Sequence, residues 1–390
     1  MHVIKSIAFR RILNSHVDFT TEFNVALEEG NVGRAASPRG ETISIYEDRN
    51  TPVDPQSIIN QIEREGCVGK PFDQEGFDAY LETRIDRFGR NNAYGLSLAF
   101  FEASRGSDSS VDLFGRRRGK LEAPRICCNI LNGGWHAYTN PVLSDFSEYL
   151  LVATSNDIAV VIGSHNEIQR VVKEKLLSQP KTVVAGNPVN RFVTEDNREC
   201  IDFLLKILDE LGFSAQFDLM IDASGTDLGT EEGYQLALTD KSFYSSDRFR
   251  EYWLNLIRQY DISFLEDPFH EKDDDAWHFL TNSQETCKII GDNYYSSSAE
   301  RIARGAGLKR THGVVIKPNQ SGTVSAVRKA VETAQRHGQI VISSHRSIST
   351  EETFLSTLTS IYEVPFIKIG PLISDYSSVM RLNEIIRLTS

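Results

Sequence analysis

The chain has 390 residues and a formal net charge of −12 at pH 7, with 40% hydrophobic and 25% charged residues. This composition is ordinary for a globular protein and allows a large core, in two or three domains or in fewer if one is a barrel. The negative charge argues against a nucleic-acid-binding surface and against an anionic membrane surface. An anionic substrate would therefore need a local basic pocket or a metal ion.

No apolar run approaches the roughly 20 residues of a membrane span, and the first residues carry no secretory cleavage pattern. The cysteines form no CxxC pair and no regular spacing, which favours structural thiols in a reducing cytosol. We therefore expect a cytoplasmic protein. The cysteines are Cys67, Cys127, Cys128, Cys200 and Cys287.

Residues 1–120 are predicted to form an α+β unit distinct from the rest of the chain. Hydrophobic patterning and turn residues indicate two strands of a hairpin, a long Gly/Ser/Pro-bearing loop, three helical segments and a polar, Gly-rich linker. In chain order these are 2–13, 16–30, 31–44, 54–66, 73–89, 91–104 and 104–124.

Residues 121–390 alternate short apolar strands with helices, which is typical of a parallel α/β array. About eight strands favour a closed barrel over an open doubly wound sheet. No Gly-x-Gly-x-x-Gly follows a first strand, which weakens the dinucleotide-binding alternative. The predicted strands are 125–131, 149–154, 217–222, 262–267, 287–292, 312–317, 339–344 and 366–370.

The last six of these strands all end in ionisable residues. In a barrel of parallel strands the carboxyl ends converge on one face, where active sites are built. Six such ends in succession predict one shared site. The residues are Asp222, Glu266, Asp292, Lys317, His345 with Arg346 and Ser347, and Lys368.

Asp222, Glu266 and Asp292 offer three hard oxygen donors from adjacent strands, which suits Mg²⁺. Without a cation, three crowded carboxylates would repel one another or protonate. The alternatives are a solvated turn at the "EDP" of residues 266–268, and helix N-caps, which would fit Asp292 best. N-capping does not explain Glu266, so the sequence predicts a metal site.

The basic strand ends suit proton abstraction next to a carboxylate. A lysine beside Mg²⁺ and another cation can act as a base, and metal and lysine together stabilise a developing dianion. Lys317 and Lys368 are the candidates, although Lys368 could also be a surface lysine. Arg346 with Ser347 resembles a phosphate clamp, because arginine binds phosphate through two parallel hydrogen bonds.

At these residues the chain resembles the enolase (phosphopyruvate hydratase) family. The segments that carry the resemblance are "NGGWHA", "SFLEDPF", "IIGDN", "VVIKPNQSGT", "SSHRSISTEETF" and "IKIGP", with "NNAYGLSLA" in the N-terminal unit. The resemblance covers nearly the whole chain. It implies an α/β fold: a modified (β/α)₈ barrel over residues 121–390, with an N-terminal α+β capping domain over 1–120.

By this resemblance the chain is a Mg²⁺-dependent lyase that dehydrates 2-phosphoglycerate reversibly to phosphoenolpyruvate. Family members are commonly homodimers or octamers with two Mg²⁺ per site, so we expect a homo-oligomer. The implied roles are metal ligation by Asp222, Glu266 and Asp292, removal of the C2 proton by Lys317, and substrate contact by His136, His345, Arg346, Ser347 and Lys368.

The departures from the family concern its acids. Asp145 stands where the family has a longer Glu, and we take Asp145 and His136 as catalytic candidates, although either could be a structural or surface residue. The family's "GDEGG" loop, whose Glu helps the hydroxyl to leave, corresponds to a stretch with Asn187 and Pro188 and no acid. In the family a mobile loop supplies a Ser ligand to the second metal. The nearest candidates for this ligand in the present chain are Ser37 and Thr42.

These departures leave three readings. The leading one is an enolase. The second is a diverged paralogue that acts on a related phospho- or phosphono-carboxylate, as carboxyphosphonoenolpyruvate synthase does. The third is a catalytically inactive enolase-like binding protein, against which the retained carboxylates and lysines argue, since an unused acidic cluster costs stability.

Overall fold

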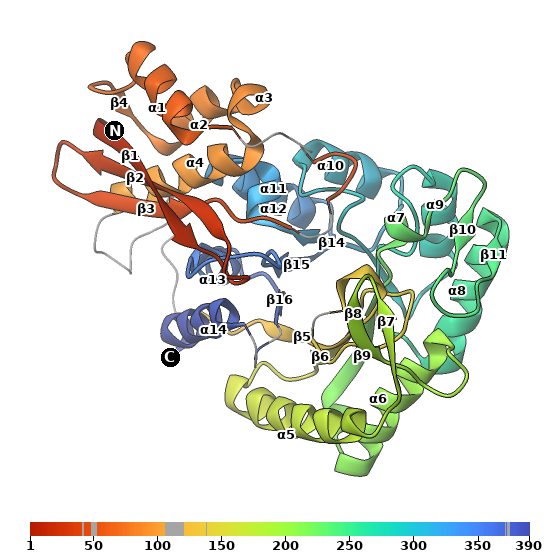
Figure 1. Cartoon of the computed structure of the whole chain (residues 1–390). Coiled ribbons are helices and arrows are strands. Elements are labelled where there is room, and N and C mark those ends of the chain that lie inside the picture. Colours follow the sequence, from red (N-terminus) through yellow and green to blue (C-terminus); the bar gives the residue numbers. More distant parts are fainter. Residues whose placement is uncertain (41–42, 48–52, 106–120, 138, 371, 373–374) are drawn as a thin grey trace.

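In a computed structural model of the chain, residues 1–40, 43–47, 53–105, 121–137, 139–370, 372 and 375–390 are described. An N-terminal unit of strands and helices packs against one side of a closed barrel (Figure 1). The predicted α/β barrel with an α+β cap is thereby confirmed. The expected boundary at residue 120 falls among residues that are not described and stays a prediction.

The capping domain is an antiparallel sheet covered by helices. Its strands lie in the order β3-β2-β1-β4. They are β1 (His2–Leu13), β2 (Phe19–Leu27), β3 (Val32–Ala36) and β4 (Pro71–Phe72), and the described helices are α1 (Pro55–Arg64), α2 (Gln74–Glu82), α3 (Ile85–Phe88) and α4 (Arg90–Arg105).

Two predictions for this domain were wrong. The predicted loop 31–44 begins with strand β3, because its side chains alternate between solvent and core and Gly33 pairs with Val25 of β2. Helix α4 lies so close to β3 that a Cβ on Gly33 would overlap the α4 backbone. The predicted helix 73–89 is two helices. The backbone N–H of Thr83 donates to carbonyls of the last turn of α2 and caps that helix at its C-terminus.

Eight strands close the barrel in the order β12-β13-β14-β15-β16-β5-β6-β9. Apolar side chains fill its interior, including Cys127, Met220 and Phe366. The strands are β5 (Arg125–Asn132), β6 (Glu148–Ala153), β9 (Phe217–Asp222), β12 (Phe264–Glu266), β13 (Lys288–Gly291), β14 (Gly313–Ile316), β15 (Ile340–Ser344) and β16 (Phe366–Ile369).

The expectation that all barrel strands are parallel was wrong for β6. Strand β6 runs antiparallel to both neighbours, with Glu148 opposite Asn132 of β5 and Asp222 of β9. A parallel return needs a crossover of a dozen or more residues, usually a helix. The described part of the 133–147 link carries only the short turn η2 (Gly134–His136), so the chain turns straight back. The first residue of β6 consequently lies where the parallel strands end.

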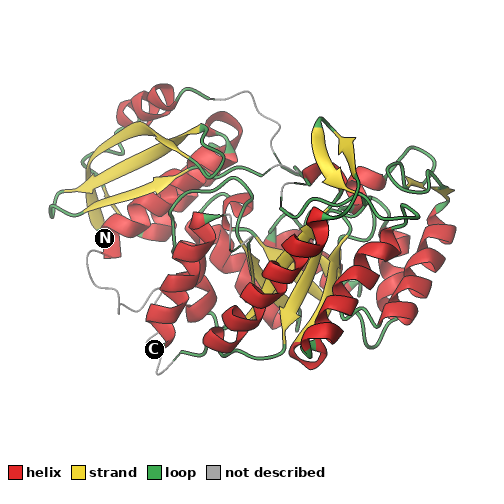
Figure 2. Ribbon diagram, turned by 60° about the horizontal axis from the view of Figure 1, so that its bottom comes forward, coloured by secondary structure: helices red, strands yellow, loops and turns green. Residues whose placement is uncertain are grey.

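Helices surround the barrel (Figure 2). The longer ones are α5 (Ile158–Leu177), α6 (Asn197–Leu211), α8 (Ser246–Tyr260), α9 (Asp274–Asn282), α10 (Ala299–Gly307), α12 (Val324–Arg336), α13 (Phe354–Ile361) and α14 (Tyr376–Thr389). Shorter elements are β7 (Lys181–Val184), β8 (Asn187–Asn190), η3 (Ser214–Gln216), α7 (Gly225–Leu228), β10 (Tyr234–Gln235), β11 (Phe243–Tyr244) and α11 (Pro318–Ser321).

None of the described helices is both long and apolar enough to cross a membrane. The cysteines are free and buried. Burial raises the pKa of Cys128 to about 12, which keeps this thiol neutral and fits the expected structural role.

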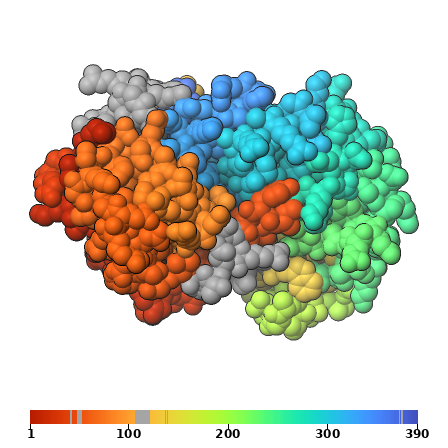
Figure 3. Space-filling view, turned by 90° about the horizontal axis from the view of Figure 1, so that it is seen from above, coloured from red at the N-terminus to blue at the C-terminus, as the bar shows by residue number. Residues whose placement is uncertain are grey.

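The capping domain also reaches the barrel through residues 43–47 (Figure 3). Ser44 is fully buried, and its Oγ donates to the carbonyl of Asn293 at 2.9 Å and to Glu271 at 3.3 Å. The segment is therefore fixed on the loops at the carboxyl ends of the strands.

Buried Asp78 makes a second junction between the two domains. It accepts hydrogen bonds from Ser97 Oγ at 2.5 Å and from the backbone N–H of Ser325 at 2.8 Å, while Ser97 accepts the N–H of Val324. Val324 and Ser325 open helix α12, whose first N–H groups have no partner within the helix. The capping domain thus supplies acceptors for the N-terminus of a barrel helix.

We predict that Asp78→Ala lowers the free energy of unfolding by about 1–3 kcal/mol, because it leaves buried donors unpaired. Chemical denaturation measures this loss. Asp86→Ala, at an exposed position of the same domain, is the matched control and should change stability by no more than about 0.5 kcal/mol. Equal stability of the two variants would contradict the proposed junction.

Candidate active site

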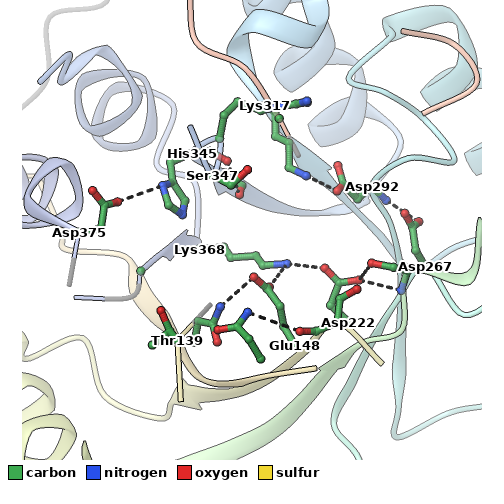
Figure 4. Close-up of a pocket in the computed structure, with 18 of the residues that line it drawn as sticks. Thr139, Glu148, Asp222, Asp267, Asp292, Lys317, His345, Ser347, Lys368 and Asp375 are labelled. Carbon is green, nitrogen blue, oxygen red and sulfur yellow. Dashed lines mark hydrogen bonds and ion pairs between the residues drawn. The ribbon is translucent and has the colours of Figure 1, made fainter. Parts of the chain in front are cut away.

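A cavity of about 290 Å³ opens where the parallel barrel strands end (Figure 4). Strand ends of the barrel and two capping-domain loops form its walls, the latter through Ser15, His16 and Gly40. Most of the predicted strand-end residues meet here, as a barrel requires. Asp222, Asp292, Lys317, His345, Arg346, Ser347 and Lys368 all line the cavity.

The three predicted metal ligands lie side by side. Asp222 and Glu266 end adjacent strands in direct register, and Asp292 follows β13, the next strand. Their exposed fractions are 8%, 0% and 4%, so the solvated turn that the sequence left open is wrong for Glu266. Glu266 Oε1 and Asp292 Oδ1 are buried and have no hydrogen-bond partner.

Burial makes it costly to charge these acids together. It raises the pKa of Glu266 well above its ordinary value, and the neighbouring Asp222 raises it further. Burial acts in the same direction on Asp222, but Lys368 outweighs it and lowers the pKa of this carboxyl. One lysine therefore supports the ionisation of only one acid of the pair, and a further cation is needed before both are charged.

The donors present fit Mg²⁺, which prefers carboxylate oxygens and keeps several waters. The two unpartnered buried oxygens support this fit. Among the described residues, however, no three His, Cys, Asp or Glu side chains converge closely enough to hold one ion. The acids would have to close up around a metal, because lysines stand between them in this arrangement.

Lys368 occupies the centre of the acidic group (Figure 4). Its Nζ lies 2.8 Å from Asp222 Oδ2, 2.7 Å from Glu266 Oε2 and 2.8 Å from Glu148 Oε2. Burial alone would lower the pKa of Lys368, but the carboxylates outweigh it and raise that pKa well above the ordinary value. Lys368 is thus a buried ammonium, not a surface lysine, while Lys317 pairs with Asp292.

Asp267, the second acid of the "EDP" segment, holds its neighbour in place. Its two carboxylate oxygens accept the backbone N–H groups of Asp292 at 2.9 Å and Asn293 at 2.7 Å. Its own backbone is left-handed, with φ of 42°, which turns the chain so that both hydrogen bonds form. Two acids in succession therefore have different tasks: Glu266 faces Lys368, and Asp267 positions Asp292.

The predicted substrate-binding residues follow strand β15. Burial lowers the pKa of His345 to about 3, and Arg381 lowers it further, so the imidazole is neutral near pH 7. Arg346 is 6% exposed, and its Nη1 lies 3.1 Å from Oε2 of Glu47 in the capping domain. A Cβ on Gly40 would overlap the guanidinium of Arg346, so a larger residue here would displace the arginine side chain from this position.

Asp145 and His136, the other catalytic candidates, differ from this group. Asp145 is 5% exposed and is not among the residues that line the cavity. Its carboxylate accepts the N–H of Leu238 at 2.7 Å, the N–H and Oγ1–H of Thr239, and Nδ2–H of Asn197. These contacts indicate a structural role. His136 belongs to η2, but its side chain lies outside the described residues, and its role stays a prediction.

Glu148 is a cavity residue that the sequence analysis did not place. Besides its contact with Lys368, its Oε1 accepts a hydrogen bond from Asn129 Nδ2 at 2.8 Å. The first residue of a parallel strand lies at the far end of the barrel, which is why the strand pattern offered Glu148 only as a residue to mutate in search of another acid and did not place it in the cavity. The short link before β6, with no predicted helix, was the signal that could have revealed its direction.

The other departures from the family also have a defined geometry. Residues 181–190, which include the stretch without an acid, form the hairpin β7–β8 around Ala185 and Gly186, both with positive φ. Asn187 and Pro188 do not line the cavity. Ser37 Oγ donates to Asn92 within the capping domain, and Thr42 lies outside the described residues.

The comparisons with known proteins agree with this geometry. A family model described as "Enolase, C-terminal TIM barrel domain" matches residues 121–390. The chain is 29% identical to an enolase of Halobacterium salinarum, over 99% of this chain and 98% of the relative. It is 30% identical to an enolase of Acidothermus cellulolyticus, over 98% and 95%, and 28% identical to one of Beutenbergia cavernae, over 98% and 96%.

These matches confirm the predicted resemblance and support an enolase-like lyase with a small-molecule substrate. At about 29% identity the family acids have had room to change, as Asp145 and Asn187 illustrate. Because the family model covers most of the chain and the similarity to enolases runs nearly from end to end, the chain belongs to the enolase family.

Proposed function

We propose that this chain dehydrates 2-phosphoglycerate reversibly to phosphoenolpyruvate and that it uses Mg²⁺. The observation that carries the proposal is the cavity lined by Asp222, Asp292, Lys317 and Lys368, with fully buried Glu266 in contact with Lys368 behind its wall. Within the family this set of residues belongs to proton abstraction next to a carboxylate. By the same resemblance we propose a cytoplasmic homodimer or larger homo-oligomer.

In the proposed mechanism Lys317, as the free amine, takes the proton from C2 of the substrate. The electron pair moves into the carboxylate, and Mg²⁺ held by Asp222, Glu266 and Asp292 would stabilise the resulting negative charge. Lys368 contributes a buried positive charge beside the cavity, where it would stabilise the developing negative charge. Arg346 and Ser347 bind the phosphate, and neutral His345 provides a hydrogen-bonding group without adding charge.

The second half of the reaction needs an acid for the departing C3 hydroxyl, and here the chain differs from the family. The side chain of Asp145 is bound to Leu238, Thr239 and Asn197, and the 181–190 hairpin lines no part of the cavity. This observation favours a second candidate function, a paralogue that acts on a related phospho- or phosphono-carboxylate.

We predict that the wild-type protein with Mg²⁺ exchanges the C2 proton of 2-phosphoglycerate with solvent faster than it forms phosphoenolpyruvate. The expected ratio is about 10²-fold, the usual effect of a misplaced catalytic group. Proton NMR in deuterated water follows the exchange, and ultraviolet absorbance follows the enol product. Dehydration at an ordinary rate of about 1–10³ per second would mean that another group supplies the acid.

The matched variant for this assay is Lys317→Ala, which should reduce exchange by about 10²–10⁴-fold, the usual contribution of a general base. Wild-type exchange in this variant would reject Lys317 as the base. Binding of a phosphonate analogue without any exchange of 2-phosphoglycerate would favour the paralogue.

We also predict that Glu266→Gln weakens Mg²⁺ binding strongly and leaves the fold intact, since it removes one anionic ligand but keeps the side-chain shape. Isothermal titration of the full chain with Mg²⁺ measures the affinity. The control is Glu285→Gln, an exposed position in the loop before β13, which should bind Mg²⁺ like the wild type. Unchanged affinity in Glu266→Gln would remove this residue from the metal site.

For Asp145 we predict a loss of stability. Asp145→Asn turns an amide donor toward the N–H groups that now donate to the carboxylate, at a cost of about 1–3 kcal/mol in the free energy of unfolding. The exposed Asp209→Asn serves as control and should retain stability. If Asp145→Asn is as stable as wild type but dehydrates more slowly, Asp145 is the catalytic acid after all.

A further inference from the structure

Lysines pair with each of the proposed metal ligands in this arrangement of the chain and balance part of their charge. Lys368 Nζ contacts Asp222 and Glu266, and Lys317 pairs with Asp292. Each of the three proposed metal ligands thus already has an ammonium partner. With the carboxylates held in this way, no described trio of potential ligands converges on one point.

A divalent cation on Asp222 and Glu266 would stand beside the ammonium of Lys368, even where it took the unpartnered Oε1 of Glu266. Lys368 Nζ lies within 2.8 Å of one oxygen of each acid, and two cations at that spacing repel strongly in a buried site. Metal binding therefore requires the ammonium to move away from both acids. A buried ammonium that moves needs another anion, because an unpaired buried charge is very costly.

Glu148 is the carboxylate that remains for Lys368. Its Oε2 lies 2.8 Å from Lys368 Nζ, and it is the one contact of this lysine outside the three proposed ligands among the carboxylates described. Asn129 Nδ2 holds Oε1 of Glu148 at 2.8 Å, which leaves Oε2 toward the lysine. Register places Glu148 directly opposite Asp222, so Lys368 can keep this contact while it shifts away from Asp222 and Glu266.

We propose that Glu148 is a positioning residue that retains Lys368 when a divalent cation takes Asp222 and Glu266. Metal binding is then an exchange of cations: the metal replaces the ammonium on the two acids, and the ammonium stays in the cavity on Glu148. The proposal rests on the metal use proposed above. It explains how the chain keeps both a metal ion and Lys368 beside the substrate.

A double-mutant cycle on the full chain tests the exchange. Isothermal titration with Mg²⁺, without substrate, compares the wild type with Glu148→Gln, Lys368→Met and the double variant. We expect Glu148→Gln to weaken Mg²⁺ binding about tenfold or more, as is typical for a residue that supports a metal site from outside the ligand set. Lys368→Met removes the competitor and should bind Mg²⁺ at least as tightly as the wild type.

The decisive comparison is the effect of Glu148→Gln in the Lys368→Met background. If Glu148 acts through the lysine, the substitution now changes the affinity less than about twofold. An equal loss in both backgrounds would make Glu148 a direct ligand and overturn the exchange, as would an unchanged affinity in Glu148→Gln alone. If the wild type binds no Mg²⁺, the metal site of the proposed function fails as well.

Folding is checked by the thermal midpoint of each variant in chelator and in Mg²⁺. Lys368→Met should melt lower in chelator, because its acids lose their counterion, and should gain more from Mg²⁺ than the wild type gains. If Lys368→Met does not fold in chelator, refolding in Mg²⁺ followed by the same titration comparison keeps the test decisive. A larger Mg²⁺ gain in wild type than in Lys368→Met contradicts the exchange.

Discussion

The structure of the barrel mouth depends on how its buried negative charge is balanced. Barrel closure places Asp222, Glu266 and Asp292 on neighbouring strands, away from water, where their mutual repulsion is strong. Lys368 and Lys317, which come from later strands of the same barrel, form ion pairs with these acids. These lysines place positive charge beside the acids without a metal ion, so the buried carboxylates have counterions in the fold itself.

The capping domain completes the opposite wall of the same cavity. Gly40 and Glu47 lie on Arg346, and Ser44 is fixed on the barrel loops. The carboxylate of Glu47 holds the guanidinium of Arg346 in a buried position, so the direction of the guanidinium is set by the fold. A buried arginine without such a partner would be costly. The two domains therefore share one electrostatic task, in which the barrel supplies the proposed metal ligands and the cap orients the arginine proposed to bind an anion.

Much of this site could be predicted from the sequence because the period of a strand and the direction of a parallel array fix where the last residue of each strand lies. That reasoning brought Asp222, Lys317 and Lys368 together correctly. It failed for Glu148, where a link without a crossover helix reverses the strand. It also could not show that Asp145 turns toward Leu238 and Thr239, because the direction of a side chain in a loop depends on contacts far along the chain. Strand β3 was missed for a similar reason. Gly33 lies in this edge strand because helix α4 packs too closely for a side chain, and that contact is distant in the sequence.

The lost and gained acids of this cavity are linked by position. Asp145 and Glu148 lie three residues apart on either side of the start of β6, yet one carboxylate is buried against the 238–239 backbone and the other faces the cavity. The segment that leads into β6 thus turns one acid away from the cavity and presents another to it. The charge that balances Lys368 is thereby preserved, although the point from which a proton could be delivered has moved.

Relatives that dehydrate the same substrate must place an acid near the leaving hydroxyl. A carboxylate that instead faces the lysine on the floor of the cavity would suit a substrate whose carboxylate or leaving group lies elsewhere. Its contact with Lys368 makes Glu148 a further residue to vary when the two proposed functions are compared.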